Sequence, residues 1–158
     1  MGQQIGYEVP RPVVDAFHKA YATRDPHQVA AFLHDDIEWT VSGPIDVLPF
    51  CGTFRGKADV LDLIARLVPG VLRVFSFVSD SILVEGDRVA MLSRQSATRT
   101  DDGRVISFRV ANFLRFQDGK VIENLSLLDS FDAVEQVLGH PLSGHEDALA
   151  GQGDLIAV

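Results

Sequence analysis

The sequence is poor in cysteine and has no long apolar run. Cys51 is the only cysteine among 158 residues, so a disulfide within the chain is excluded. The longest apolar stretches, such as residues 71–78, contain polar residues and fall far short of the roughly 20 residues that a membrane span needs. No apolar export signal stands at the start. We therefore expect a soluble protein of the reducing cytoplasm.

Basic residues are also scarce and scattered. Lys and Arg total 14 against 22 Asp and Glu, which gives a net charge of -8 at pH 7. An acidic chain without a basic cluster is a poor partner for nucleic acid or for an anionic membrane. We expect neither partner.

Motifs for metals and cofactors are missing too. The five histidines have no spacing that would gather them on one metal, and no glycine-rich phosphate loop or dinucleotide fingerprint is present. The sequence therefore predicts no metal and no cofactor.

The first half of the chain has helical periodicity with one strand. Apolar residues recur at helical spacing over residues 11–23, Asp25 and Pro26 form a capped start for a second short helix, and residues 57–67 form a third. Residues 37–42 alternate apolar and polar side chains, which is typical of a strand with one buried face. The segment between them, residues 43–56, is predicted to be a loop that carries Phe50 and Phe54 and folds over a binding space.

The second half has strand periodicity. Strands are predicted over residues 73–84, 89–100, 105–116 and 121–128, and the short turns between them favour an antiparallel meander. A last helix is predicted over residues 131–138. We expect an α+β fold in which a cone-shaped, curved antiparallel sheet wraps around the N-terminal helices, with one domain over residues 1–138 and an irregular C-terminal tail over 139–158.

Several short motifs support a family resemblance. Asp25-Pro26, the stretch from His34 to Trp39, the stretch from Gly52 to Lys57 and the stretch from Phe113 to Val121 occur in an order and spacing that resemble the nuclear transport factor 2-like superfamily. The resemblance covers about residues 10 to 138. It implies a cystatin-like α+β barrel that often dimerises through its sheet. Members include ketosteroid isomerases, SnoaL-like polyketide cyclases and limonene epoxide hydrolases, so it does not imply one activity.

The resemblance argues against ketosteroid isomerisation. That reaction needs a carboxylate base, a tyrosine and a protonated acid around the substrate carbonyl. Aligned with this chain, the base falls at Val41, the tyrosine at Phe17 and the second acid at Asn112. Only Asn112 can donate a hydrogen bond, so this mechanism is not expected.

The other two enzyme classes give a similar picture. In the epoxide hydrolases an arginine bridges two aspartates; here the arginine aligns with Arg94, but the aspartates fall at Ser96 and Ser126. The cyclases use an acid deep in the pocket, for which Asp129 is the nearest candidate. Asp129 also starts the last helix, and since Asp is common at helix caps, the capping role is the favoured interpretation.

The candidate pocket residues each have a structural alternative. Trp39 and Tyr21 are able to stack on a flat ligand or simply to fill the core, and Asn112 is able to bind a ligand oxygen or a neighbouring side chain. Arg94 is able to hold a ligand oxygen or to reach solvent. The predicted lining consists of Phe17, Tyr21, Trp39, Val41, Phe50, Phe54, Arg94, Ser96, Asn112, Ser126 and Leu128, with Asp129 as the candidate acid.

Three functions remain open on this evidence. The first is a SnoaL-like cyclase, isomerase or hydratase that acts on an apolar, polyketide-like or terpenoid molecule. The second is a binding module that holds an apolar small molecule without changing it. The third is a homodimeric scaffold whose hollow is filled by its own side chains.

Overall fold

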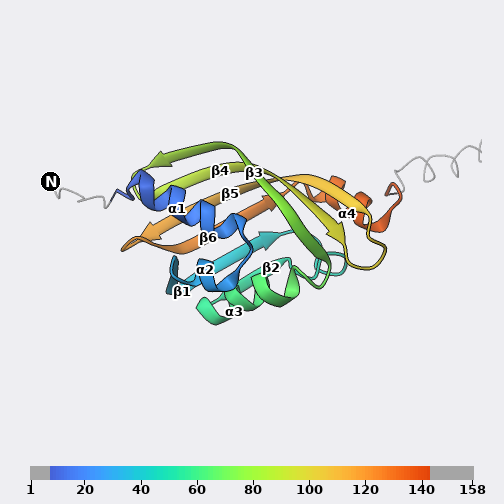
Figure 1. The fold of residues 1–158 in the computed structure, drawn as a ribbon, viewed down its shortest axis with the longest axis horizontal. Helices are drawn as coiled ribbons and strands as arrows, with labels where there is room; N and C mark the ends of the chain where they lie inside the picture. Colours follow the sequence, from blue (N-terminus) through green and yellow to red (C-terminus); the bar gives the residue numbers. More distant parts are fainter. Residues whose placement is uncertain (1–7, 143–158) are drawn as a thin grey trace, which may run out of the picture.

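One curved sheet with helices on one face forms the architecture (Figure 1). The computed structural model describes residues 8–142. The six strands are β1 (Leu33–Ser42), β2 (Gly52–Arg55), β3 (Leu72–Glu85), β4 (Arg88–Arg99), β5 (Val105–Gln117) and β6 (Lys120–Leu128). Their order across the sheet is β2-β1-β6-β5-β4-β3. The predicted α+β fold with a curved sheet and N-terminal helices is confirmed.

The sheet combines a meander with one parallel pair. Strands β3 to β6 pair antiparallel in chain order, as the turn spacing predicts. Strand β1 lies parallel to β6, and β2 pairs antiparallel with β1. The sheet remains open, with β2 and β3 at its edges, and so does not close into the barrel that the resemblance implies.

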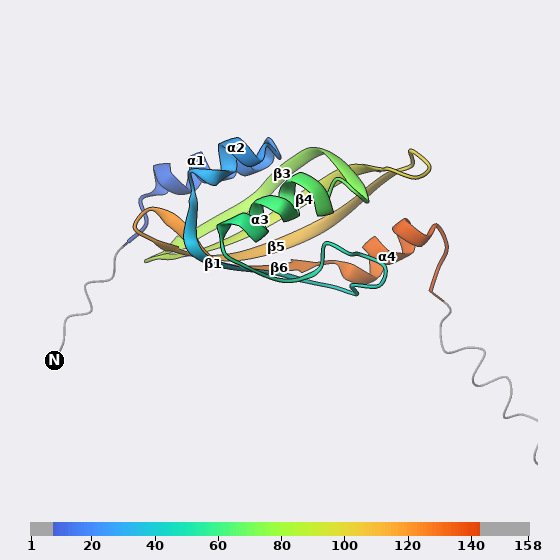
Figure 2. The same ribbon diagram turned by 90° about the horizontal axis from the view of Figure 1, so that it is seen from below.

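The N-terminal helices cover one face of the sheet, which we call the inner face (Figure 2). Helix α1 (Arg11–Ala22) buries Val14, Phe17, Ala20 and Tyr21, a spacing that places them on one side of the helix. Helix α2 (Pro26–Ala30) follows at once, and the Asp25 carboxylate accepts a hydrogen bond from the backbone N–H of His27 at 2.9 Å. The predicted helical hairpin is therefore present, with Asp25 as its cap.

The third helix changes its winding halfway. Helix α3 (Lys57–Asp62) is followed by a π-helical turn, η1 (Leu63–Leu67), in which the Val68 N–H donates to the Leu63 carbonyl at 3.0 Å. The sequence predicts a single helix over residues 57–67, so the π turn is a finding of the structure. π turns occur often at functional sites, and this one faces the sheet with Leu63 and Ile64 buried.

Two other elements differ from the expectation. The predicted loop 43–56 contains β2, because Gly52 to Arg55 pair with β1 at the sheet edge. The first strand begins at Leu33 rather than at residue 37. The last helix, α4 (Ser130–Leu138), ends at Gly139, whose left-handed φ of 80° suits glycine.

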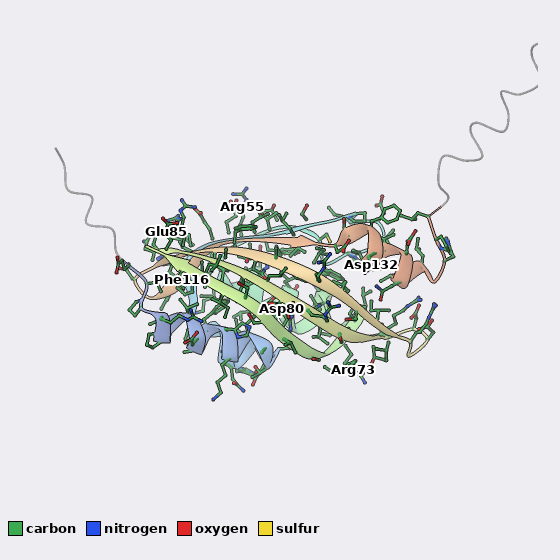
Figure 3. The ribbon with its side chains drawn as sticks, turned by 90° about the horizontal axis from the view of Figure 1, so that it is seen from above. Arg55, Arg73, Asp80, Glu85, Phe116 and Asp132 are labelled. Atoms are coloured by element: carbon green, nitrogen blue, oxygen red, sulfur yellow. The ribbon has the colours of Figure 1, made fainter. Side chains whose placement is uncertain are left out.

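The core lies between the helices and the inner face. Trp39, Phe17 and Phe108 are the largest of its fully buried side chains. Glu85, at the end of β3, and Asp132, in α4, lie toward opposite ends of the molecule (Figure 3). No helix within residues 8–142 is long and apolar enough to cross a membrane. Most of the predicted tail, residues 143–158, lies outside the described residues.

Candidate functional site

A small cavity lies between α1, the π turn and the inner face of the sheet. Its volume is about 40 Å³. Aromatic and aliphatic side chains make up most of its wall, and three polar side chains, those of Arg24, Gln95 and Ser126, complete it. The lining consists of Tyr21, Arg24, Trp39, Val41, Phe50, Leu63, Ile64, Val68, Gln95, Val110, Ser126 and Leu128.

A second hollow of about 120 Å³ adjoins the first. The two share Arg24, Ile64 and Val68, so these three side chains form the partition between them. Pro69, Leu72, Arg73 and Val74 complete the outer hollow. A ligand larger than a few atoms would occupy both hollows and would need the partition to move.

A buried amide network stands behind the cavity wall. Asn112 donates through Nδ2 to Ser126 Oγ at 2.7 Å and to Asn124 Oδ1 at 3.2 Å, and Asn124 Nδ2 donates to Ser126 Oγ at 2.8 Å. Asn112 is only 1% exposed, and its Oδ1 has no partner. The network fixes the Ser126 side chain in place and leaves the Asn112 Oδ1 acceptor beside it without a donor among the described residues.

Other buried polar atoms also lack a partner within residues 8–142. They are His18 Nε2, Arg24 Nε, Ser79 Oγ and Ser93 Oγ. Because most buried polar groups in folded proteins are hydrogen-bonded, such a set calls for water or a ligand in the interior. Ser79 and Ser93 are directly paired across β3 and β4 on the inner face.

The predicted pocket residues divide into two groups. Six of them line the cavity: Tyr21, Trp39, Val41, Phe50, Ser126 and Leu128. Three others lie next to it without lining it. Phe17 stacks on Tyr21 with ring centroids 5.8 Å apart, Phe54 pairs with Trp39 across β2 and β1, and Asn112 bonds to Ser126.

Arg94 and Ser96 lie on the opposite, outer face of the sheet. Arg94 is exposed, and Ser96 Oγ donates to Ser107 Oγ at 3.1 Å. Side chains alternate between faces, so the neighbouring Ser93 and Gln95 face inward instead. The apolar residues Val89 and Met91 mark the inward positions of β4 in the sequence. Continuing this alternation along the strand predicts that Gln95 faces inward and Arg94 outward.

Asp129 also lies away from the cavity. Its carboxylate is 3.6 Å from Nη2 of Arg109, and the Asp129 side chain is 40% exposed. Asp129 occupies the N-cap position of α4, but its side chain makes no capping hydrogen bond. The carboxylate is thus a solvent-exposed partner of Arg109, and this position gives it no contact with the cavity.

Burial alters the titration of two groups near the interior. Burial raises the pKa of the Cys51 thiol to about 11, which disfavours the reactive thiolate at neutral pH. Burial also lowers the pKa of His18, and the nearby Asp15 carboxylate partly opposes that shift. Neither residue lines the cavity.

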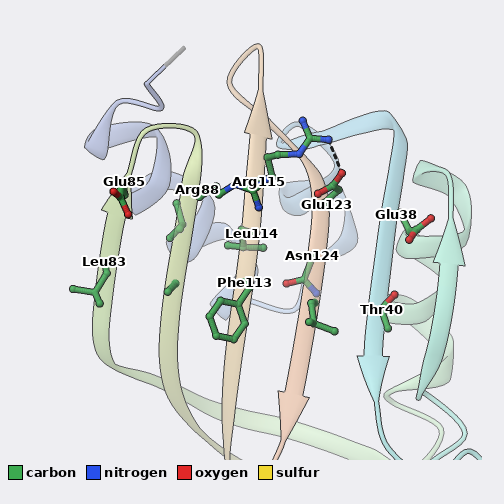
Figure 4. A pocket seen from close by; sticks show the side chains of 13 residues that line it. Glu38, Thr40, Leu83, Glu85, Arg88, Phe113, Leu114, Arg115, Glu123 and Asn124 are labelled. Atoms are coloured by element: carbon green, nitrogen blue, oxygen red, sulfur yellow. Dashed lines mark hydrogen bonds and ion pairs between the residues drawn. The ribbon is translucent and has the colours of Figure 1, made fainter. Parts of the chain in front are cut away.

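A much larger hollow than the interior cavity lies on the outer face (Figure 4). It has a volume of about 560 Å³ and is open, and side chains of β1, β3, β4, β5 and β6 surround it. The ion pairs Arg115–Glu123 and Arg55–Glu38 lie in or beside it. These pairs are exposed to solvent, where ion pairs contribute little to binding or stability.

Comparison with protein families identifies the fold family. The model of the SnoaL-like domain matches residues 14–124. The chain belongs to the SnoaL-like family. SnoaL-like proteins are among the groups of the nuclear transport factor 2-like superfamily that the sequence resembles, so the predicted resemblance is confirmed.

Solved structures agree with this assignment. A protein from Rhodopseudomonas palustris named "Putative Isomerase" is 36% identical, with a TM-score of 0.70 over 80% of this chain and 93% of that one. An NTF2-like protein from Burkholderia pseudomallei is 22% identical, with a TM-score of 0.69 over 84% and 96%. A ketosteroid isomerase-like fold from Catenulispora acidiphila is 15% identical, with a TM-score of 0.67 over 83% and 95%. The last two show the fold alone. None of the curated proteins compared with the SnoaL-like domain matches it.

Among residues 8–142, no carboxylate lines the cavity of this SnoaL-like domain. Arg24 is the one charged residue of the described lining, and the other groups with polar atoms are an amide, a hydroxyl, a phenol and an indole. Such groups are able to orient a ligand oxygen, but none is a carboxylate base. Within residues 8–142, no three His, Cys, Asp or Glu side chains lie close enough to hold a metal ion.

Proposed function

We propose that this SnoaL-like domain binds a small, flat, mainly apolar molecule that bears a carbonyl or hydroxyl group, in the cavity between its helices and its sheet. One observation carries the proposal: aromatic walls and a buried hydrogen-bonding group without a partner, Arg24 Nε, occur together in one cavity. Tyr21, Trp39 and Phe50 suit the face of a ring, and Ser126 suits its oxygen. Sites that bind small molecules are typically concave and largely apolar, with a few polar groups.

The volumes limit the size of the ligand. A hollow of about 40 Å³ beside one of about 120 Å³ suits a single ring with a polar substituent rather than a sterol. A monocyclic terpenoid or a small aromatic polyketide fits within the two hollows if the side chains of Ile64 and Val68 move aside. A π turn precedes Val68, and such turns occur often at functional sites.

Binding without turnover is the function that the lining supports best. The residues that align with the base of the isomerases and with the aspartates of the epoxide hydrolases are Val41, Ser96 and Ser126, and none of them is an acid. Asp129, the candidate acid of a cyclase, has its carboxylate beside Arg109 in solvent. Isomerisation is the second candidate, and the name of the 36% identical relative is what favours it.

A thermal-shift screen followed by mass spectrometry tests the proposal. The panel contains monocyclic terpenoids, phenols, aryl ketones and small aromatic polyketides. A ligand at about 100 times its dissociation constant adds ~2.7 kcal/mol of stability, which is readily seen as a higher melting temperature. Recovery of the stabilising compound unchanged supports a binding module, and recovery of an isomer supports an enzyme. If no compound stabilises the protein, the filled scaffold becomes the better account.

We also propose that two copies associate through the outer face of the sheet. Six exposed apolar side chains form what we call the outer patch: Val78, Leu83, Leu92, Phe113, Leu125 and Leu127. By strand register, Leu83, Ala90, Phe113 and Leu125 form one row across the sheet, and Leu92, Ala111 and Leu127 form the next. A continuous apolar strip on an uncovered sheet face is typical of an interface. A location in the reducing cytoplasm stays a prediction.

A further inference from the structure

We propose that the ligand of the interior cavity carries an anionic oxygen group, such as a carboxylate or an enolate, and that Arg24 binds this group with Gln95 and Ser126. This inference rests on the function proposed above, because it names the chemical class of the molecule that the cavity takes. The alignment with known enzymes of the fold assigns no role to Arg24, and the residue falls at the junction of α1 and α2, where sequence patterns predict only a turn.

Arg24 is held in one orientation by aromatic rings. Its guanidinium carbon lies 4.2 Å from the ring centroid of Tyr21 and 4.9 Å from that of Phe77. Its backbone has a positive φ of 58°, which is uncommon for a residue other than glycine. An unusual backbone conformation and two aromatic contacts together aim this side chain at the interior rather than at solvent.

The charge of Arg24 has no counter-ion in the structure. No carboxylate within residues 8–142 forms an ion pair with it. Its Nη2 donates to Gln95 Oε1 at 2.6 Å, but its Nε is buried without an acceptor. A half-buried cation that lacks a counter-ion is costly, and an anionic ligand would remove that cost.

The surroundings of Arg24 reject cations and favour anions. Among the described residues, Arg24 is the charged residue of the inner hollow, the exposed Arg73 joins it in the outer hollow, and no aspartate or glutamate lines either. The whole chain carries a net charge of -8, so the charge of these linings is opposite in sign to the net charge of the chain. A site of this kind raises the local preference for negative groups.

The hydrogen-bonding groups of the cavity match an acceptor. Ser126 Oγ already accepts from Asn112 and Asn124, which fills both of its acceptor positions and leaves its O–H free to donate. Gln95 Oε1 accepts from Arg24, which leaves the Gln95 Nε2 as a donor. Arg24, Gln95 and Ser126 therefore each have a donor available, and an oxyanion is a group that accepts from three donors at once.

The size of the inner hollow agrees with this group. A volume of about 40 Å³ holds roughly three water molecules, which is close to the space that a carboxylate needs. The aryl or alkyl body of the ligand would then extend past Ile64 and Val68 into the outer hollow of about 120 Å³. The anionic group of the ligand thus meets Arg24, Gln95 and Ser126, and its apolar body runs from the aromatic wall of the inner hollow to the aliphatic side chains of the outer one.

Paired probes that differ only in charge test the inference. Benzoate and cinnamate are titrated against the intact protein beside benzamide and cinnamamide, and affinities are measured by calorimetry. We expect each carboxylate to bind roughly tenfold or more tightly than its carboxamide, because charge-assisted hydrogen bonds are the stronger ones. Arg24→Gln should abolish this preference and leave carboxamide affinity nearly unchanged. Arg94→Gln, which removes an exposed arginine on the outer face, should alter neither.

The outcomes separate this inference from the proposed function. Equal affinity for carboxylate and carboxamide would overturn the anionic group and leave the interior site standing. Binding of neither probe would overturn both. If Arg24→Gln does not fold, Arg24→Lys keeps the charge and loses the planar fork of donors, so it should weaken carboxylate binding severalfold more than carboxamide binding. An equal effect of Arg24→Lys on both probes would also overturn the inference.

Discussion

Burial controls the reactivity of the single cysteine. With its pKa raised to about 11, Cys51 is expected to exist as thiolate in about one molecule in a thousand at pH 8. Its side chain is also only 3% exposed. We expect a thiol reagent such as iodoacetamide to label native protein very slowly, and to label protein unfolded in urea at the rate of a free thiol. Rapid labelling of the native protein would show that the thiol is accessible or activated.

Burial also makes His18 a source of acid sensitivity. The pKa of His18 is lower in the folded protein than its ordinary value, so the unfolded chain binds more protons as the pH falls through that value. Above the ordinary pKa, His18 is neutral in both the folded and the unfolded state and does not affect the unfolding free energy. Below that pKa, the unfolding free energy falls as the pH falls. We expect His18→Gln to lose stability less steeply than the wild type between about pH 7 and pH 5, as measured by urea unfolding.

The matched control for this test is His27→Gln, at an exposed position of α2. Its pH dependence should follow that of the wild type. If both substitutions change the slope equally, burial of His18 does not cause the effect.

Sequence patterns identify cavity residues where the residue type matches its surroundings. Tyr21, Trp39 and Val41 fall on apolar positions of a helix or strand, so periodicity alone predicts that they face inward. Arg24 gives no such signal, because a charged residue after a helix is normally solvated. Its inward direction depends on a left-handed backbone and on Phe77, which lies far along the chain. A contact of that kind cannot be predicted from local sequence.

At the level of elements, the aspartates at the N-cap positions of α2 and α4 differ in whether they make a capping hydrogen bond. The Asp25 side chain accepts the His27 N–H, whereas the Asp129 side chain makes no capping hydrogen bond at α4. We expect Asp25→Ala to lower the unfolding free energy by about 1 kcal/mol. Asp129→Ala should cost less, since its ion pair with Arg109 is exposed. Urea unfolding of the two variants measures the difference, and equal losses would contradict this view of the caps.

Strand alternation predicts the meander well, because β4, β5 and β6 each have one buried face, β3 has one partly buried face, and each strand is joined to the next by a short turn. Strand β2 is only Gly52–Arg55 and begins with glycine, so its local pattern resembles a loop. Its pairing with β1 supplies the strand character. The π turn after α3 leaves the spacing of buried residues nearly unchanged, and for that reason the sequence predicts an ordinary helix there.

At the level of the whole molecule, the outer patch predicts self-association. We expect the wild type to sediment as a dimer at micromolar concentration and Phe113→Asp to sediment as a monomer, because a charge in the middle of an apolar interface is strongly disfavoured. Phe113 is 49% exposed, so the monomer should tolerate the change. Ile45→Asp, an exposed apolar position in the loop before β2, is the matched control and should remain dimeric. A monomeric wild type, or a dimeric Phe113→Asp variant, would refute the interface.

The order of elements and the family follow from the sequence, whereas the open edges of the sheet and the size of the interior do not. Closure depends on the strand twist and on how β2 and β3 end, and both are set by contacts between distant residues. The volume of the cavity depends on how the side chains of the partition pack. The sequence therefore predicts an apolar hollow but not one as small as about 40 Å³.

The most direct test of the account uses Trp39, the only tryptophan in the chain and a wall of the interior cavity. Its fluorescence should change saturably as a stabilising ligand is titrated, with the same dissociation constant that calorimetry gives. Such agreement would place the ligand at the interior cavity. Binding that stabilises the protein while leaving Trp39 fluorescence unchanged would place the ligand elsewhere, with the hollow on the outer face as the next site to examine, and would contradict the central claim.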